Sequence, residues 1–537
     1  MKQILFVFLY SITYASAQSV EYCTPTKYRT WWDVQHYSIS TEINSKKKSI
    51  SGKTMICAKV NEKPIDTIQI DLDKRLKLSS IYYKGKKLKL IKGDRAHLVI
   101  GPFSQLKAEE HFDLEINYKG NPLIAHRAPW DGGLVFNKDK SGNPWIAVAC
   151  QGDGASVWWP LKDDPTDEPD NGVDLFYTVP KGLTAVGNGR LMDKNESKKK
   201  TEWHWKVENP INLYDVTFYI GDYVHWSDSI NGEKGNLSLD YWVLRDNLEK
   251  SKKQFEVVKP MLHCFENWFG PYPFYEDGYK LVDAPYLGME HQSAIAYGNQ
   301  YRMGYLGMDR SMSGVGLLFD YIIVHESGHE WFGNNISIKD VAYSWIHEGF
   351  TTYSESLFAE CQFGKEKAYN YQHGEWNGIE NDRPMEGTPE ICDGGSSDHY
   401  DKGAAMIHMI RTIMSDDEEF RLMLREMNAT FGKGTVTGEQ IEEFINEYAN
   451  KDFSKLFEQY LRTKKVPILE FTSNNENIVQ YRWSNCVADF DMPVLIHLQE
   501  EKIWLYPTKE WQEFETELDL NLDISVSPDF YINTLKK

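Results

Sequence analysis

Short runs in which apolar and polar residues alternate fill the first part of the chain, from Gln18 to roughly Asp222. Residues 36–43, 67–72 and 111–118 are three such runs, and Gly, Asn, Asp and Lys residues separate them. Because successive side chains of a strand point to opposite faces, each run predicts a strand with one buried face. Many short strands in succession are typical of a β-sandwich, so we expect an all-β domain here.

The hydrophobic pattern changes near Tyr223, where helical periods replace the alternation. Residues 248–269 predict an amphipathic helix that stops at Gly270. Residues 314–332 contain two apolar stretches and predict a buried helix that stops at Gly333. We therefore expect the middle of the chain to be mostly helical.

Alternation returns after Pro467 in four runs, which predict the strands of a second, smaller β-sandwich: residues 468–471, 478–483, 494–498 and 514–520. A chain of 537 residues is too long for one compact domain. The predicted domains are an N-terminal all-β sandwich over residues 18–222, a mostly helical domain over residues 223–465, and a small C-terminal β-sandwich over residues 466–537.

The first 17 residues have the three parts of a signal peptide. Lys2 supplies a positive start, residues 4–12 are mostly apolar, and Ala15-Ser16-Ala17 forms a small-residue cleavage site. The apolar stretch is too short for a permanent membrane span, and no later window reaches 18 apolar residues. We expect an exported protein, periplasmic or extracellular, with no permanent membrane span.

The net charge and the cysteine positions argue against nucleic-acid binding and against a zinc site made of thiolates. The formal net charge of −20 argues against a nucleic-acid partner, since a phosphate backbone requires a basic surface. The seven cysteines are spread singly with no CxxC pair, which argues against a zinc–thiolate site. One or two disulfides are compatible with export, but the sequence does not indicate which cysteines pair.

A metal site is indicated by His325-Glu326-Ser327-Gly328-His329, inside the predicted helix of residues 314–332. Residues four apart lie about 6 Å from each other on one helix face, so both imidazoles can reach one zinc ion. Glu326 then faces the open side of that ion, where it can take a proton from water. The alternative is a surface helix that carries these residues by chance. The apolar residues just before them argue against it, because two buried histidines need partners.

A third ligand is expected from the next helical stretch, which begins at Ser344 and runs to about Phe363. Glu348 follows His329 by 19 positions and is the candidate. Glu355 lies two turns further along the same helix face, where it is either an acceptor for a ligand imidazole N–H or a solvated surface charge. We expect one Zn²⁺ per chain.

These residues resemble the aminopeptidase N and leukotriene hydrolase family of zinc metallopeptidases. That family carries HExxH and, 19 positions after its second His, a Glu in a stretch such as NEGF. Here the stretch is His347-Glu348-Gly349-Phe350, with His347 in place of Asn. Residues 329–334 are similar to the family's HxWFGN. The resemblance implies an N-terminal sandwich, a thermolysin-like α/β catalytic domain and a small sandwich. It does not extend to the large helical C-terminal domain of many members.

Three further segments of the resemblance imply substrate contacts. Gly288, Met289 and Glu290 are similar to the centre of the GxMEN motif, whose Glu binds a free α-amine, although Leu287 and His291 depart from its ends. Residues 400–403 are similar to YxKG, whose Tyr stabilises the oxyanion, which points to Tyr400. Gln151 resembles a glutamine in an N-domain loop that helps to bind the N-terminal end of the substrate.

The implied activity is that of an exported zinc aminopeptidase acting on peptides with a free N-terminus. In this interpretation Glu326 is general base and acid, Tyr400 stabilises the oxyanion and Glu290 binds the α-amine. Three alternatives stay open: an endopeptidase or an epoxide hydrolase with the same zinc site, or a peptide-binding module without catalysis. The preferred first residue and the oligomeric state are not indicated by the sequence.

Overall fold

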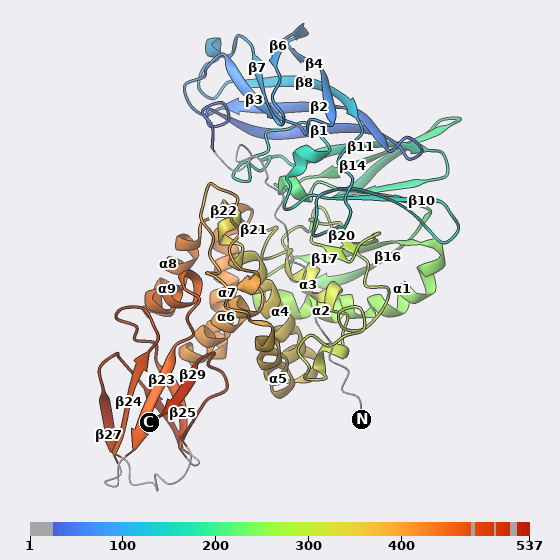
Figure 1. Cartoon of the computed structure of the whole chain (residues 1–537). Helices are drawn as coiled ribbons and strands as arrows, with labels where there is room; N and C mark the ends of the chain where they lie inside the picture. Colours follow the sequence, from blue (N-terminus) through green and yellow to red (C-terminus); the bar gives the residue numbers. More distant parts are fainter. Residues whose placement is uncertain (1–24, 474–477, 499–500, 516–523) are drawn as a thin grey trace, which may run out of the picture.

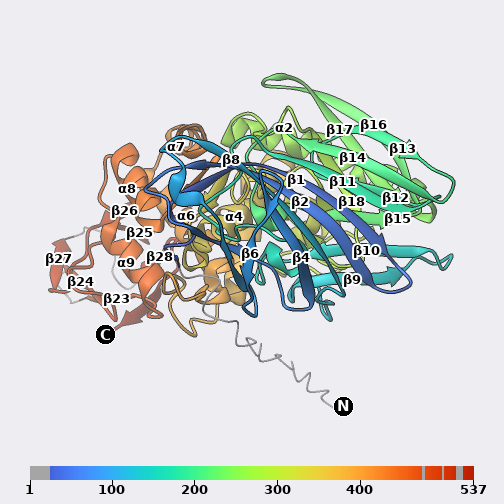
Figure 2. The ribbon, with the colours of Figure 1, turned by 90° about the horizontal axis from the view of Figure 1, so that it is seen from above.

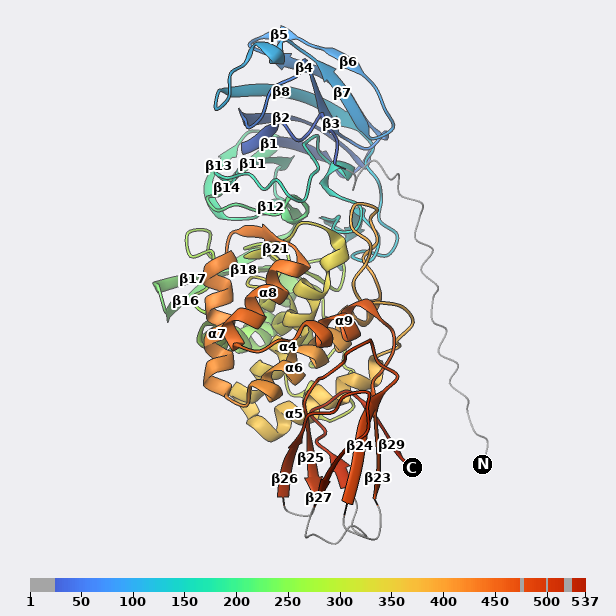
Figure 3. The same ribbon diagram turned by 90° about the vertical axis from the view of Figure 1, so that its left-hand side faces the viewer.

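The computed structural model describes residues 25–473, 478–498, 501–515 and 524–537. A β-rich region, a helical region and a small β region follow one another down the molecule, as Figures 1 and 3 show. Seen from above, the small β region lies to one side of the other two (Figure 2). This order confirms the predicted fold class. The predicted signal peptide, residues 1–17, and residues 516–520 of the last predicted strand lie outside the described residues.

The N-terminal region contains one large sheet and two smaller ones. The large sheet has the strand order β13-β14-β11-β1-β2-β8-β4-β5, and the smaller sheets have the orders β12-β15-β10-β9 and β3-β7-β6. Buried and less buried residues alternate along the central strand β1, as its sequence predicts. The strands are β1 (Trp32–Asn44), β2 (Ser49–Val60), β3 (Thr67–Asp71), β4 (Leu76–Tyr83), β5 (Lys86–Lys87), β6 (Lys89–Ile91), β7 (Ala96–Ile100), β8 (His111–Gly120), β9 (Gly133–Lys138), β10 (Pro144–Ala149), β11 (Val173–Pro180), β12 (Thr184–Gly187), β13 (Arg190–Glu196), β14 (Lys200–Val207) and β15 (Phe218–Gly221).

A five-stranded sheet, in the order β16-β17-β18-β20-β19, lies between this region and the helices (Figure 1). Helix α4 packs against α3, α5 and α6 in the centre of the helical region. The elements are β16 (Tyr223–Gly232), β17 (Gly235–Leu244), α1 (Leu248–Gln254), α2 (Val258–Phe269), β18 (Tyr279–Asp283), β19 (Gly288–Met289), β20 (Ile295–Tyr297), α3 (Tyr321–Gly328), β21 (Ile336–Ile338), α4 (Trp345–Phe363), α5 (Lys365–Glu375), α6 (Asp401–Met414), α7 (Asp417–Phe431), β22 (Gly434–Val436), α8 (Gly438–Ala449) and α9 (Ser454–Arg462).

The C-terminal region is built from two small sheets, in the orders β27-β24-β23-β29 and β26-β25-β28. Trp483 and Phe490 are buried in its core, with ring centroids 5.4 Å apart. The strands are β23 (Ile468–Ser473), β24 (Ile478–Ser484), β25 (Val494–Leu498), β26 (Glu501–Leu505), β27 (Gln512–Glu515), β28 (Ile524–Val526) and β29 (Asn533–Lys536).

The helix predicted over residues 314–332 is much shorter in the structure, and its predicted extent was wrong. Helix α3 starts after Asp320, whose carboxylate accepts hydrogen bonds from the amides of Ile322 and Ile323 and so caps the helix. The apolar residues before this cap form a 3₁₀ turn after Gly314, which has a left-handed conformation. His329 follows the last helical residue but keeps helical dihedrals, with φ −61° and ψ −21°. The two histidines therefore stay one turn apart.

One disulfide among the described residues joins the helices, between Cys264 of α2 and Cys361 of α4. This disulfide links α4, which carries Glu348 and Glu355, covalently to α2. Cys57, Cys150 and Cys486 are free thiols. None of the helices in the described part of the chain combines the length and apolarity needed to cross a bilayer.

Candidate metal centre and active site

His325 of α3, His329 just after α3 and Glu348 in the first turn of α4 point at one another. The two Nε2 atoms of His325 and His329 are 3.3 Å apart. Glu348 Oε2 lies 3.5 Å from the first and 3.4 Å from the second. Four ligands at zinc bond lengths of about 2.0–2.1 Å are separated by about 3.3–3.4 Å when the geometry is tetrahedral. The three atoms thus form one face of such a tetrahedron.

The electrostatics of this face also fit a cation. All three side chains are buried, and Glu348 Oε2 accepts no hydrogen bond. A buried carboxylate oxygen without a partner is costly unless a positive charge lies beside it. Burial alone would raise the pKa of Glu348, but the imidazoles of His329 and His325 hold that pKa well below its ordinary value. The donor set of two imidazoles and one carboxylate is one that zinc prefers.

Outer partners orient both imidazoles. His325 Nδ1 is 2.7 Å from Glu355 Oε1, and the hydroxyl of Tyr371 donates to the other oxygen of the same carboxylate. His329 Nδ1 donates to the backbone oxygen of Phe332 at 2.9 Å. With Nδ1 protonated in each ring, the lone pair of Nε2 faces the centre of the cluster. Glu355 is fully buried, so it is not a solvated helix charge.

Replacement of Glu355 by glutamine is expected to lower the affinity for zinc by about 10- to 100-fold, because the neutral amide is a weaker acceptor for the His325 N–H than the carboxylate is. Competition with a chromophoric chelator measures this affinity. Glu366→Gln is the matched control, since Glu366 is exposed on α5. An unchanged affinity in Glu355→Gln would show that this contact does not support the ligand.

Glu326 lies on α3 beside the cluster and is buried against Gly288 of β19. A Cβ atom at position 288 would come within 2.4 Å of Glu326 Oε1 and 2.8 Å of Ile322 Cγ2, so a larger residue there would displace the carboxylate from this position. Burial and the nearby carboxylate of Glu290 raise the pKa of Glu326 to about 8, against the opposite effect of His325.

Glu290 directly follows β19 and is held by side chains from outside that strand. Gln151 Nε2 donates to Glu290 Oε1 at 2.7 Å, and the hydroxyl of Tyr214 donates to the same oxygen at 3.1 Å. A carboxylate oxygen of Glu290, one of Glu326 and a ring nitrogen of His329 all lie within 4.8 Å of one another. Gln151 comes from the loop after β10, so the N-terminal region contributes directly to the site.

Tyr214 is a residue that the sequence reasoning missed. It lies in a short 3₁₀ turn, residues 213–215, in the segment between β14 and β15. No motif or period in the sequence marks it, because its relation to Glu290 arises only from the packing of the N-terminal region on the five-stranded sheet.

Tyr400 lies just before α6, with its ring 5.9 Å from that of His325 and inclined to it by 29°. Burial and the carboxylates of Glu348, Glu290 and Glu326 raise the pKa of Tyr400 well above its ordinary value. The hydroxyl therefore keeps its proton and is available as a donor beside the metal cluster.

The residues that depart from the family motifs make structural contacts. His347 Nε2 accepts a hydrogen bond from the amide of Ile338 at 3.1 Å, and burial lowers the pKa of this imidazole to about 3, so it is neutral. An asparagine side chain can accept the same bond through its oxygen. His291 is fully buried behind Glu290, with its Nδ1 2.6 Å from the hydroxyl oxygen of Tyr219. Leu287 accepts a backbone hydrogen bond from Gly298 at 2.7 Å.

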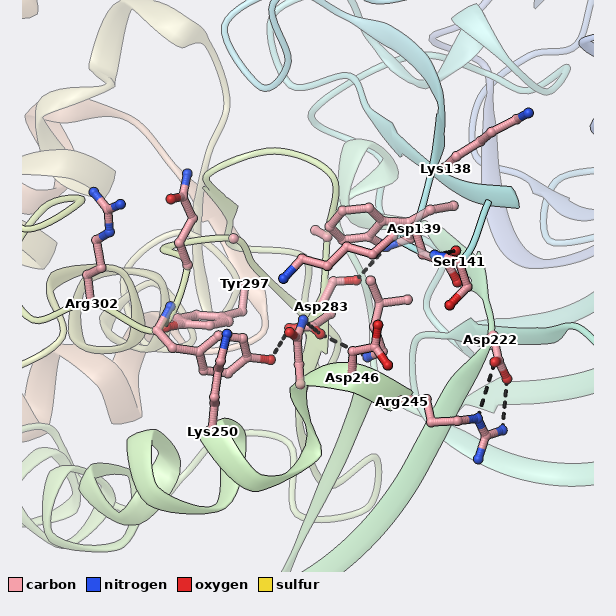
Figure 4. Close-up of a pocket in the computed structure, with 18 residues that line it drawn as sticks. Lys138, Asp139, Ser141, Asp222, Arg245, Asp246, Lys250, Asp283, Tyr297 and Arg302 are labelled. Carbon is pink, nitrogen blue, oxygen red and sulfur yellow. Dashed lines mark hydrogen bonds and ion pairs between the residues drawn. The ribbon is translucent and has the colours of Figure 1, made fainter. Parts of the chain in front are cut away.

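Several cavities in the described part of the chain lie where the N-terminal and helical regions meet. One of 290 Å³ reaches the metal cluster and is lined by residues that include Gln151, Tyr214, Val341, Glu348 and Tyr400. A larger one of 460 Å³ lies between the β9–β10 hairpin and the start of α1, and none of the metal-cluster residues lines it (Figure 4).

Two acidic groups of the larger cavity already have partners. Asp222 pairs with Arg245 at 2.9 Å, and Asp283 accepts from the hydroxyl of Tyr301 and the amide of Asn247 (Figure 4). The smaller cavity, with its unpartnered carboxylate oxygen, is therefore the candidate active site.

Comparison with known proteins agrees with this geometry. Residues 253–460 match the model of the peptidase family M1 domain. The chain is 22% identical over 465 residues to leukotriene A-4 hydrolase of Xenopus laevis, which covers 80% of this chain and 70% of that protein. It is 22% identical to aminopeptidase N of Lactobacillus helveticus, over 81% of this chain and 51% of that protein. It is 25% identical to aminopeptidase B of Rattus norvegicus, over 64% of this chain and 51% of that protein.

Solved structures share the fold. An M1 zinc metallopeptidase from Deinococcus radiodurans superposes with a TM-score of 0.68 at 19% identity, over 83% of this chain and 98% of that one. A two-domain M1 zinc metallopeptidase mutant with bound L-tryptophan gives a TM-score of 0.67 at 20% identity, over 81% of this chain and 96% of that one. The chain spans about half the length of the curated aminopeptidases that it matches.

Proposed function

Since residues 253–460 form a peptidase family M1 domain with a zinc-type ligand cluster, we propose that the protein is an aminopeptidase that removes N-terminal residues from peptides. The observation that carries this proposal is the place of Glu290. Its carboxylate lies within 4.8 Å of both Glu326 and His329. A buried carboxylate so close to the metal ligands is a binding site for an ammonium group.

Simple geometry then selects the first peptide bond. In an amino acid, the α-nitrogen and the carbonyl carbon are joined through one Cα and lie about 2.5 Å apart. A substrate whose ammonium contacts Glu290 therefore presents only its first carbonyl to the metal cluster. A chain that continued past Glu290, as an endopeptidase requires, would leave this carboxylate buried with no ammonium group beside it. The contact thus favours an exopeptidase.

Each residue has a role that follows from its position. A zinc ion held by His325, His329 and Glu348 would polarise the scissile carbonyl and make water more acidic. Glu326 accepts the proton of the attacking water and delivers it to the leaving amine. The hydroxyl of Tyr400 donates to the carbonyl oxygen as negative charge develops on it. Gln151 and Tyr214 hold the Glu290 carboxylate in place for the ammonium group.

We also propose that the peptidase site holds one zinc ion and that the protein is exported, to the periplasm or the extracellular space. The cluster of His325, His329 and Glu348 beside Glu326 supports the first. The signal-type composition of residues 1–17 supports the second.

Removal of the metal tests the proposal. Treatment with a strong chelator is expected to abolish hydrolysis of an amino-acid amide with a free amine, and zinc added after removal of the chelator should restore it. The metal content of each sample is measured beside the rate. Full activity in a sample shown to contain no metal would exclude the proposed chemistry.

Replacement of Tyr400 by phenylalanine is expected to lower kcat by about 10²- to 10³-fold, because one donor to the oxyanion is lost. The KM and the zinc content should change little, since Tyr400 is not a ligand. The matched control is Tyr506→Phe, because Tyr506 is exposed on the C-terminal region. A kcat equal to that of the unmodified protein would show that the hydroxyl does not contact the transition state.

A further inference from the structure

A second cluster of ligating side chains lies where the helical region meets the C-terminal sandwich. His373 comes from the last turn of α5, His408 from the middle of α6, and Asp529 from the turn between β28 and β29. Each offers one ligand atom, and the three atoms lie within 4.8 Å of one another. Figures 1 and 3 show α5 beside the sandwich, at the end of the helical region opposite the N-terminal sheets.

The geometry resembles that of the first cluster. Asp529 Oδ1 lies 3.1 Å from Nε2 of His373 and 3.1 Å from Nε2 of His408. These separations are close to the edge of about 3.3–3.4 Å between ligands of a tetrahedral zinc ion. The two imidazoles thus approach the same carboxylate oxygen through the same ring nitrogen.

Neighbouring groups fix the orientation of two of the three side chains. His408 Nδ1 lies 3.2 Å from the hydroxyl oxygen of Tyr353, which also accepts a hydrogen bond from Arg411 at 3.3 Å. The second oxygen of Asp529 accepts from the hydroxyl of Ser527 at 2.9 Å. Both contacts leave His408 Nε2 and Asp529 Oδ1 directed at the centre of the cluster. Partners of this kind are typical of metal-bound imidazoles and carboxylates.

Solvent reaches this cluster from the side of His373 and Asp529 only. The side chain of His408 is 1% exposed, whereas those of His373 and Asp529 are 23% and 18% exposed. An ion can therefore enter from solvent, and water can complete its coordination on the open side. Two imidazoles and one carboxylate suit zinc and similar divalent transition metals, whereas Ca²⁺ and Mg²⁺ prefer oxygen ligands alone.

We propose that His373, His408 and Asp529 bind a second zinc-type divalent ion, which joins the C-terminal sandwich to the catalytic helices. The ligands come from two helices and from a turn more than a hundred residues later, with 156 positions between His373 and Asp529. An ion bound by all three would resist separation of the two regions.

The surrounding contacts make this junction a defined interface. The hydroxyl of Tyr460 on α9 donates to the backbone oxygen of Tyr531 at 2.8 Å, and Asn381 donates to the Tyr531 hydroxyl at 2.8 Å. Trp376 packs edge-on against the Tyr531 ring. The ion adds to these contacts and shares no ligand with the peptidase site, so the effect we expect is on stability and domain association. The inference does not depend on the proposed function.

Metal stoichiometry tests the inference. Metal-free full-length protein is loaded with zinc, desalted and analysed for bound metal by mass spectrometry. The unmodified chain is expected to hold two equivalents, and His373→Gln and Asp529→Asn one each. A variant with His325→Ala and Glu348→Gln should also hold one. The matched control His263→Gln, which changes an exposed histidine of α2, should hold two.

Thermal unfolding gives a second test that does not depend on counting zinc equivalents. In the variant with His325→Ala and Glu348→Gln, zinc at about 100 times its dissociation constant should raise the unfolding midpoint by several degrees. Addition of Asp529→Asn to that variant should abolish the increase. The proposal would be overturned by two equivalents in His373→Gln, or by one equivalent in the unmodified chain that disappears in the variant with His325→Ala and Glu348→Gln; the cluster would then be only an ion pair. Loss of the peptidase-site zinc alone would instead lower the counts only in chains with intact His325 and Glu348, and so is distinguishable.

Discussion

Replacement of Glu326 by glutamine is expected to lower kcat by about 10²- to 10⁴-fold, the usual contribution of a general acid–base group. Glutamine has the same shape, so it fits beside Gly288, but it cannot accept the proton of the attacking water. His325, His329 and Glu348 are unchanged, so the zinc content should be that of the unmodified protein. Steady-state hydrolysis of an amino-acid amide measures kcat, and metal analysis measures zinc.

The matched control for this variant is Glu366→Gln, which removes an exposed carboxylate from the same region. If kcat of Glu326→Gln stayed within threefold of the control, another group would have to be the base. A loss of both activity and zinc would show that Glu326 supports the metal cluster and would leave its role in proton transfer unsupported.

Replacement of Glu290 by alanine is expected to reduce kcat/KM for substrates with a free amine by about 30- to 5,000-fold. Truncation of one partner of a buried, hydrogen-bonded charge pair costs about 2–5 kcal/mol, which corresponds to this range. Substrates with an acetylated amine have no charge to lose, so their rates should change much less. The ratio of kcat/KM for the free and the acetylated amide is the quantity to measure.

Glu290→Gln serves as the conservative partner of this variant. It keeps a side-chain oxygen that can accept from Gln151 and Tyr214 but removes the negative charge. Loss of selectivity in both variants would assign the effect to the charge. Equal losses for free and acetylated substrates would show that Glu290 shapes the site without binding the amine.

The sequence predicted those parts of the site that are local or belong to a motif. His325, Glu326 and His329 lie within one helical turn of one another, so a helical pattern is enough to bring them together. Glu348 came from the next helical stretch and Tyr400 from the family resemblance. Helix α4 lies where the helical pattern placed it, from Trp345 to Phe363. The alternation of apolar and polar residues predicted both β regions, because every second side chain of a strand lies on the buried face of its sheet.

The sequence could not predict relations that depend on packing between regions. Tyr214 contacts Glu290 across 76 positions, and no local pattern marks it. The pairing of Cys264 with Cys361 spans 97 positions. The beginning of α3 was missed because Asp320 interrupts an apolar stretch and looks like one polar residue of a helix, whereas its carboxylate caps the helix. His373, His408 and Asp529 carry no metal-binding spacing, and only the fold brings them together.

The central claim is that a carboxylate beside the metal cluster selects peptides by their free amine. The most direct test compares kcat/KM of the unmodified, zinc-loaded protein for one fluorogenic amino-acid amide and for its N-acetylated form. The free-amine amide should be hydrolysed at least about 30-fold faster, because the acetylated form leaves Glu290 without an ammonium partner. Equal rates for the two substrates would contradict it.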